Sequence, residues 1–411
     1  MMGTMVATVA FEPTDLADVD DPYPLLAEVR ASGSITRTPS GFWCVTGYRA
    51  ALELLRHPAA TSGPIALRYS AALPPGAARD EMSNRINFLD PPDHPRVRGL
   101  VSKAFTPRRV ADMRPITEGI AARLLDELES HDEFDLLSRY AHQVPSLVIS
   151  EMLGVPFDDR DQLTAWSDAV TPLLGVQLEP TEKADALAAA EEFAHYLSDL
   201  IEVRKSAPGD DLLSALIAAE EDGQRLSRPE LLSLATTLYS AGHRTTRDLT
   251  TNGLSVLLRR SDILDDVRSE RLALSALVQE FLRYETPTLF VARLPARAIE
   301  VDGVELPEMA PALIVLAAAN RDPEAFPDPD EFDPSRFADG ASGTALGPGP
   351  LSFAFGPHYC LGASLARMES EVMVRSVLGR FPRLSVVDDN LRWRQRGPFR
   401  SLESLVVSTT V

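Results

Sequence analysis

Apolar residues recur at three- and four-residue spacing from residue 95 to about residue 285, a spacing that is typical of amphipathic helices. The longest such segment runs from Glu230 to Arg259. At 1.5 Å per residue, a helix of that length would span roughly 45 Å, enough to cross a whole domain. We therefore predict a mainly helical fold with this helix at its centre.

The flanking segments predict further elements. Residues 13 to 32 and 48 to 57 read as helices, separated by a short strand region in which apolar and polar residues alternate around a Pro-Ser-Gly turn. Residues 60 to 92 are rich in Gly, Pro, Ala and Ser, which predicts a long mobile loop.

The last third of the chain has a mixed pattern. It predicts short strands around residues 289 to 301 and 311 to 317, then a final helix that begins near Cys360. Because no internal repeat or long low-complexity linker divides the sequence, we expect one domain over residues 1 to 411.

Composition and charge exclude several classes of partner. The chain has 411 residues and a formal net charge of -20, so it repels phosphate backbones and nucleic acid is not an expected partner. It has no run of eighteen apolar residues and no basic N-terminal segment, so we predict neither a membrane anchor nor a signal peptide. The two cysteines, Cys44 and Cys360, fit lone thiols in a reducing cytoplasm, with Cys44 as a small buried hydrophobe.

Cys360 has the surroundings of a metal-binding thiolate. A Gly-rich loop delivers it to the start of an amphipathic helix, where free N–H groups and the positive end of the helix dipole favour the thiolate form. Such a thiolate can bind heme iron, and no second cysteine lies nearby to complete a zinc site. We expect the neighbouring residues to shape the site: Gly356 turns the backbone under the porphyrin, Gly362 lets the helix approach it, Phe353 shields the sulfur and His358 reaches a propionate.

This segment resembles the heme-ligand signature of the cytochromes P450, Phe-x-x-Gly-x-His/Arg-x-Cys-x-Gly, with every specified position matched. The resemblance extends over roughly residues 10 to 411. It implies a mainly α fold with small β-sheets, a triangular prism of helices around a buried heme b (iron protoporphyrin IX), and Cys360 as the ligand of the iron.

A second motif is Glu280 and Arg283, which stand three apart on a predicted helix among apolar residues. This setting indicates a buried ion pair that needs a further partner. The resemblance supplies Arg336 as that partner and implies that the three residues brace the cysteine loop.

Three further residues are candidates for heme contacts. His94 and Arg98 fall four apart at the start of a helix and so share a face. The resemblance implies that this pair, together with Arg293, binds the anionic heme propionates.

The long helix carries a motif and an anomaly in Ala241-Gly242-His243-Arg244-Thr245-Thr246. This stretch is similar to the oxygen-binding kink of the family, with Gly242 leaving room for dioxygen and Thr245 helping to carry protons. Where the family has an acid, this chain has Arg244, and a guanidinium cannot shuttle protons. Either Arg244 points away from the heme, or it alters the reaction; Asp248, one turn on, could pair with it.

The resemblance implies an enzyme: a cytoplasmic, monomeric heme-thiolate monooxygenase of secondary metabolism that inserts an oxygen atom from O2 into a small organic substrate. Because the sequence has no flavin or nicotinamide domain, the electrons would come from a ferredoxin or flavodoxin with its reductase. One alternative is an atypical oxidation (aromatic coupling, nitration or a peroxide-driven reaction), suggested by Arg244. Another is a catalytically silent recruiting or sensing module.

By analogy with the family, the substrate pocket draws on the 60 to 92 loop, the 170 to 185 region, the long helix near Leu238 to Thr245, residues 287 to 291, and a C-terminal turn near Phe399. We expect it to be lined by apolar and aromatic side chains, with Thr237, Tyr239 and Thr288 able to orient the substrate. The apolar candidates are Leu238, Ala241, Leu289, Phe290, Val291 and Phe399.

One further departure from the family lies at Leu306-Pro-Glu-Met309, where Ile-Pro-Ala-Gly is common. We expect a local change in this turn without a catalytic consequence.

Overall fold

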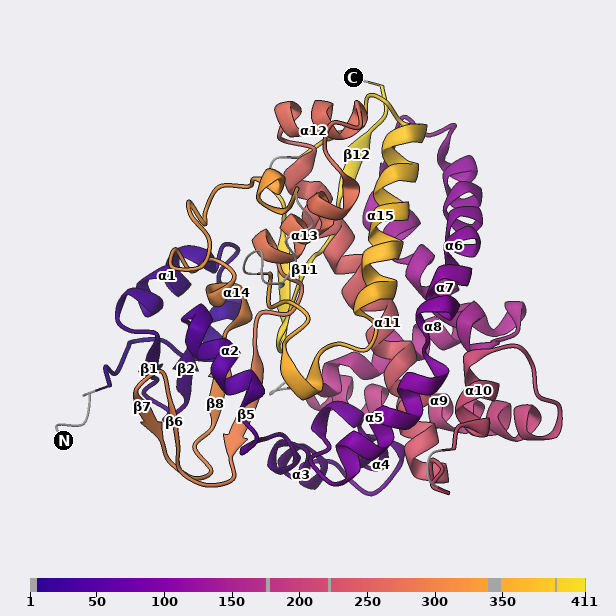
Figure 1. Ribbon diagram of the computed structural model, residues 1–411. Coiled ribbons are helices and arrows are strands. Elements are labelled where there is room, and N and C mark those ends of the chain that lie inside the picture. The colour runs from indigo at the N-terminus through magenta and orange to yellow at the C-terminus, as the bar shows by residue number, and fades with distance from the viewer. Residues whose placement is uncertain (1–5, 175–177, 221–222, 339–348, 389, 411) are drawn as a thin grey trace.

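The computed structural model describes residues 6–174, 178–220, 223–338, 349–388 and 390–410. Helices dominate, and α11 (Arg228–Leu257) runs through the middle of the molecule, as the sequence predicts (Figure 1). The other longer helices are α1 (Tyr23–Ala31), α2 (Tyr48–Arg56), α3 (Gly63–Ala71), α4 (Ala77–Asn84), α5 (Asp93–Ala104), α6 (Pro107–Leu128), α7 (Gln143–Leu153), α8 (Arg160–Val170), α9 (Pro180–Ser206), α10 (Leu212–Ala218), α12 (Ser261–Arg268), α13 (Leu274–Tyr284), α14 (Leu316–Ala319) and α15 (Ala363–Arg380).

The start of α11 is fixed by a capping box. The hydroxyl of Ser227 accepts a hydrogen bond from the N–H of Glu230, and the carboxylate of Glu230 accepts one from the N–H of Ser227. These bonds satisfy N–H groups that have no partner inside the helix. The helix then continues without a break to Leu257.

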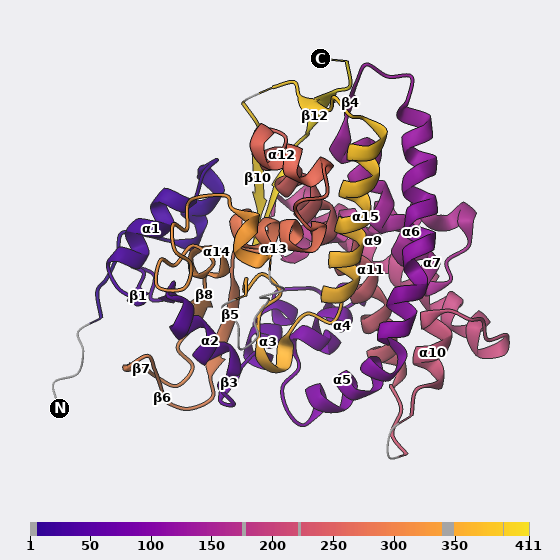
Figure 2. The same ribbon diagram turned by 45° about the horizontal axis from the view of Figure 1, so that its top comes forward.

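The strands form small sheets on the side of the molecule opposite α6 and α7 and at its C-terminal end (Figures 1 and 2). In the largest sheet the order is β1-β2-β8-β5-β3, and β2 pairs in parallel with β8. The strands are β1 (Ile35–Arg37), β2 (Trp43–Val45), β3 (Ala60–Thr61), β4 (Glu133–Asp135), β5 (Val291–Pro295), β6 (Ile299–Val301), β7 (Val304–Leu306), β8 (Ala312–Ile314), β9 (Ser385–Val386), β10 (Trp393–Arg396), β11 (Phe399–Leu402) and β12 (Val406–Ser408). Cys44 is buried at the centre of β2, and both cysteines are free.

The prediction of a long loop over residues 60 to 92 is wrong, because this segment contains β3, α3, α4 and the short helix η2 (Ile86–Phe88). The carboxylate of Asp90 accepts the N–H groups of Ser62 and Gly63 at 2.8 and 2.7 Å, which holds the start of α3. In α4, the side chains of Ala78 and Met82 pack in an apolar cluster. The small residues therefore mark tight packing here, and not mobility.

The main hydrophobic core lies where α6, α7, α11, α13 and α15 pack together. Two views show α15 beside α6, with α11 behind them (Figure 2). Tyr140, which is fully buried, ties this core to α15 by donating a hydrogen bond to the carbonyl oxygen of Met373 at 3.0 Å. Within the described residues, no helix combines the length and apolar character that a membrane span requires.

Candidate active site

A cavity of about 960 Å³ lies against α11. Its walls come from distant parts of the chain: α4, α11, β5 and the segment that precedes α15. This volume is at the upper end of the range of small-molecule sites.

Cys360 faces this cavity from a tight loop. The N–H of Cys360 donates to the carbonyl oxygen of Phe353 at 3.0 Å, and the N–H of Tyr359 donates to that of Gly356 at 3.0 Å. Burial raises the pKa of the Cys360 thiol, while a hydrogen bond from the backbone of Gly362 and the charge of Arg98 oppose that rise. A sulfur so placed is stabilised as a thiolate once a metal cation binds it.

The glycines of the loop have separate roles. Gly356 has a φ of +72°, and a Cβ there would lie 2.7 Å from the carbonyl oxygen of Leu55. It is therefore required by the close approach to the end of α2, a reason that the sequence did not reveal. A Cβ at Gly362 would have no protein atom within 4 Å, which is consistent with a planar group lying over this position. Phe353 lines the cavity, and its ring lies 4.6 Å from the guanidinium carbon of Arg367.

His94, Arg98, Arg293 and His358 all line one side of the cavity. The ring centres of His94 and His358 lie 4.0 Å apart with the rings tilted by 35°, and Arg98 donates to the carbonyl oxygen of Tyr359 at 2.8 Å. Burial lowers the pKa of Arg293 to about 10. Burial, with the neighbouring Arg293, His94 and Arg98, lowers the pKa of His358 to about 3. Two arginines beside imidazoles that can donate hydrogen bonds suit an anionic ligand, so the donor set fits heme propionates.

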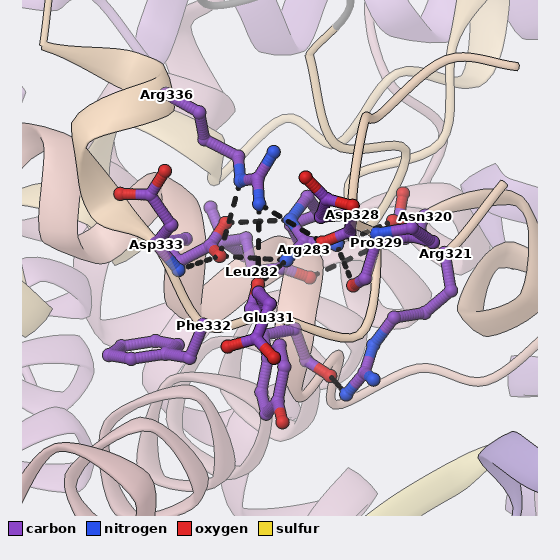
Figure 3. A network of polar contacts seen from close by, with 12 residues as sticks. Leu282, Arg283, Asn320, Arg321, Asp328, Pro329, Glu331, Phe332, Asp333 and Arg336 are labelled. Atoms are coloured by element: carbon purple, nitrogen blue, oxygen red, sulfur yellow. Dashed lines mark hydrogen bonds and ion pairs between the residues drawn. The ribbon is translucent and has the colours of Figure 1, made fainter. Parts of the chain in front are cut away.

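Glu280 and Arg283 form a fully buried ion pair with two contacts of 2.7 Å. Arg283 also donates to the carbonyl oxygens of Pro329 and Glu331 at 2.7 and 2.8 Å, and Arg336 lies 3.5 Å from Glu280. Figure 3 shows Arg283 surrounded by these carbonyl groups, with Arg336 reaching in. The predicted triad is therefore present as a contact network.

Asn320 links this network to the cysteine loop. Its carbonyl oxygen accepts from Arg283 at 3.2 Å. Its side chain accepts from the N–H of Leu351 at 2.7 Å and donates to Ser352 at 2.8 Å, and these two residues directly precede Phe353. The sequence analysis did not identify Asn320, because its role depends on contacts with residues far away in the sequence.

Four residues of α11 also line the cavity: Ala241, Gly242, Arg244 and Thr245. The hydroxyl of Thr245 donates to the carbonyl oxygen of Ala241 at 2.7 Å. A Cβ at Gly242 would lie 3.4 Å from the side chain of Ile149, which is an ordinary van der Waals contact, so packing against α7 does not by itself require glycine here.

Arg244 is buried and borders the cavity, contrary to the alternative in which it points away. Its Nε lies 4.0 Å from Oδ2 of Asp248, and its guanidinium carbon lies 5.8 Å from the centre of the Phe399 ring. Asp248 contacts Arg247 more closely, at 2.7 Å. Burial raises the pKa of Asp248, and the two arginines oppose that rise.

The comparisons with known proteins agree with this geometry. The cytochrome P450 family model matches residues 65–395. The chain is 38% identical to the 6-deoxyerythronolide B hydroxylase of Saccharopolyspora erythraea, over 94% of this chain and 96% of that protein. It is also 38% identical to the cytochrome P450 monooxygenase PikC of Streptomyces venezuelae, over 94% and 91% of the two chains.

The chain belongs to the cytochrome P450 family. Solved P450 structures superpose along nearly its whole length. CalO2 gives a TM-score of 0.90 at 30% identity, covering 98% of this chain and 99% of that chain. P450BioI, solved with a fatty acid-ligated acyl carrier protein, gives 0.86 at 30% identity, covering 97% and 99%. The predicted fold class is confirmed.

Membership of the family decides several predictions. This P450 is an oxidoreductase of the monooxygenase class with a heme-thiolate cofactor, and not a catalytically silent module. Bacterial P450s receive electrons from external redox partners, as the sequence analysis expected for this chain.

Two of the expected pocket residues do not border the P450 cavity. Leu238, Ala241, Phe290, Val291 and Phe399 line it, as do Thr237 and Thr288. Leu289 instead packs in a separate apolar cluster with Phe11 and Cys44, because alternate residues of an extended segment face opposite sides. Tyr239 is buried against α7 and α8, and its hydroxyl lies 3.0 Å from those of Ser150 and Thr164.

A polar cluster on the cavity wall was missed, because Glu81 and Arg85 fall in the segment that we expected to be a loop. Arg85 is buried, and its Nε lies 3.0 Å from the carboxylate of Glu81 and 3.3 Å from the hydroxyl of Thr237. Thr237 donates to the same carboxylate at 3.0 Å. This Glu81–Arg85–Thr237 cluster is where α4 meets α11 inside the cavity.

Proposed function

We propose that Cys360 binds the heme iron as a thiolate, and that this P450 inserts one oxygen atom from O2 into a C–H bond of an oxygen-bearing secondary-metabolite intermediate. The observation that carries the proposal is that Cys360 and Thr245 border the same cavity. The bound heme supplies the oxygen activation, for which an electron-rich thiolate is a suitable ligand.

His94, Arg98, Arg293 and His358 hold the propionates in this proposal. Each is a hydrogen-bond donor, or becomes one on protonation, and together they place positive charge beside the cysteine loop. The negative charge of Asp90 acts to raise the pKa values of His94 and Arg293, and it partly balances the positive charge of this group.

Thr245 is the residue that would hold a proton near the iron. Its hydroxyl donates to Ala241 within α11, so its oxygen keeps lone pairs that can accept a hydrogen bond from the cavity. Arg244 contributes a fixed positive charge beside it, and protons would reach Thr245 through water.

The electrons would come from a ferredoxin or flavodoxin with its reductase, acting on a monomeric P450. We propose a separate electron donor because the sequence shows no GxGxxG segment that would bind a nucleotide cofactor.

The substrate class is supported by the cavity wall. Phe290, Val291 and Phe399 offer apolar contact, while the Glu81–Arg85–Thr237 cluster presents both donors and an acceptor. A buried polar cluster favours a ligand that can pair with it over one that cannot. Relatives named as a 6-deoxyerythronolide B hydroxylase and as a polyketide biosynthesis P450 agree with a polyketide-like substrate.

The iron ligand is tested by the spectrum of the reduced protein under carbon monoxide. We expect the red-displaced band of a sulfur-ligated heme, and we expect Cys360→Ala to lack it, whereas Cys44→Ala keeps it because Cys44 is buried in β2. A Cys360→Ala protein that binds heme and retains the band would refute the assignment.

The substrate class is tested by the Soret shift that accompanies ligand binding. Macrolactones should bind at least about tenfold more tightly than saturated fatty acids of equal carbon number, because a site with buried polar groups rejects ligands that cannot pair with them. Arg85→Met should remove this preference while Arg228→Met, which changes an exposed arginine at the rim, should leave it. Equal affinities in the unaltered protein would contradict the proposed class.

A second candidate is an atypical oxidation: aromatic coupling, nitration or a peroxide-driven reaction. The observation in its favour is that Arg244 borders the cavity directly beside Thr245. Turnover with purified redox partners should be compared with turnover on hydrogen peroxide alone, for the unaltered protein and for Arg244→Glu. The first proposal expects partner-driven hydroxylation to dominate in the unaltered protein; peroxide-driven product that Arg244→Glu abolishes would favour the second.

A further inference from the structure

His142, Asp168 and His243 converge from three segments, outside the set of residues that line the cavity. His142 directly precedes α7, Asp168 lies in α8 and His243 lies in α11. Nε2 of His243 lies 3.2 Å from Oδ1 of Asp168, and Nε2 of His142 lies 3.5 Å from Oδ2. Two imidazoles therefore face the two oxygens of one carboxylate.

The hydrogen bonding of His243 indicates what this arrangement needs. Its Nδ1 lies 3.2 Å from the carbonyl oxygen of Tyr239, which can only accept, so Nδ1 carries the hydrogen. In the neutral ring, Nε2 then presents a lone pair to the Asp168 carboxylate, which is also only an acceptor. A cation between the two atoms resolves this conflict. Metal-binding histidines commonly hold their other N–H on a backbone carbonyl in this way.

The spacing and exposure fit a metal ion. Two ligand atoms about 2.1 Å from a tetrahedral ion are separated by roughly 3.4 Å, and the observed separations lie on either side of that value. The side chain of His243 is fully buried, but those of His142 and Asp168 are 17% and 39% exposed. The ion could therefore enter from solvent and keep a water molecule as its remaining ligand.

The charged groups around the two histidines come from α8 and α11. Arg244 and Arg247 oppose a cation, while the carboxylates of Asp168 and Asp248 favour one.

We propose that His142, Asp168 and His243 bind a divalent transition-metal cation of the Zn²⁺ type, at a site separate from the heme. The ion joins α7, α8 and α11. Since α8 leads directly into η5 (Thr171–Leu174), whose residues line the cavity, the ion also anchors one wall of the substrate site. This site does not depend on the proposed substrate or reaction.

The test uses the full-length, heme-loaded protein after treatment with a chelator. Titration with zinc chloride, followed by calorimetry and elemental analysis, should give one site per chain. Asp168→Asn and His243→Gln should each weaken it by at least about 100-fold, since the loss of a ligand costs at least as much as the loss of a supporting contact. The matched control is His195→Gln, because His195 and Asp199 form an exposed pair at 3.6 Å and should not contribute.

The carbon monoxide spectrum and the melting temperature show whether each variant is folded, and Asp168→Asn is the variant least disturbing to the core because its side chain is partly exposed. Zinc should raise the melting temperature of the unaltered protein and of His195→Gln, and not that of Asp168→Asn. Two results would overturn the proposal: zinc affinity that Asp168→Asn and His243→Gln both leave unchanged, or no zinc uptake together with a pH-dependent loss of stability in His243→Gln. The second result would mean that protonated histidines, and not a metal, neutralise the carboxylate.

Discussion

The two walls of the heme cavity are held in different ways. The cysteine loop is braced by long-range contacts: Glu280, Arg283 and Asn320 are fully buried and bind backbone atoms far away in the sequence. On the α11 wall, Thr245 bonds within its own helix, and Arg244 has its Nε 4.0 Å from Asp248. Substitutions in the brace of the cysteine loop should therefore lower stability, whereas substitutions on the α11 wall should change the chemistry while the helix remains intact.

The largest effect should come from breaking the brace. Arg283→Ala leaves Glu280 buried without its closest partner, with only Arg336 at 3.5 Å, and breaking a buried pair typically costs about 3–5 kcal/mol of unfolding free energy. Urea unfolding, followed by heme absorbance, measures the loss. The control is Arg394→Ala, which removes a surface pair with Glu403 and should cost less than about 1 kcal/mol. Equal losses in the two variants would remove the distinction between the walls.

The opposite result is expected on α11. Thr245→Ala should lower partner-driven product formation by about 10²-fold, the lower end of the range for a group that assists proton transfer, with little change in stability. Thr251→Ala is the matched control, because its hydroxyl makes the same bond to the carbonyl four residues back, away from the cavity. If both variants retain full activity, Thr245 does not hold the catalytic proton.

The same contrast explains how much could be predicted from the sequence. The Cys360 motif, the Glu280–Arg283 pair and the central helix were identified because local spacing encodes them. Features that depend on distant partners were not predicted. The helices α3 and α4 form where Asp90 and apolar neighbours hold them, and Gly356 is required because a carbonyl group of α2 lies close to it. Leu289 was wrongly assigned to the pocket because the sequence does not show on which side of the extended segment before β5 each side chain lies.

A pH experiment sharpens the description of the cysteine wall. The folded pKa of His358, about 3, lies below its ordinary value of 6.5, so the unfolded chain takes up the proton first as the pH falls. The heme-free protein should therefore lose stability between pH 6.5 and 3, by up to about 1.4 kcal/mol per pH unit for one proton. His358→Gln should flatten this part of the profile, and bound heme should as well, because its carboxylates favour the protonated ring. An unchanged slope in His358→Gln would mean that other groups carry the effect.

The smallest effect is expected at Met309, a departure from the family pattern that lies on neither wall. The sequence led us to expect a changed turn, and Met309 has a φ of +57°, the left-handed conformation that glycine adopts easily. That conformation costs a non-glycine residue about 1–2 kcal/mol. Met309→Gly removes this cost. It also makes the unfolded chain more flexible, which lowers the free energy of unfolding by roughly 0.4–1 kcal/mol. The net gain should be below about 1 kcal/mol, visible as a slightly higher melting temperature with unchanged turnover. A change in turnover would show that the turn between β7 and β8 is coupled to the cavity. That result would contradict the contrast between the two walls, which assumes that stability and chemistry depend on different residues.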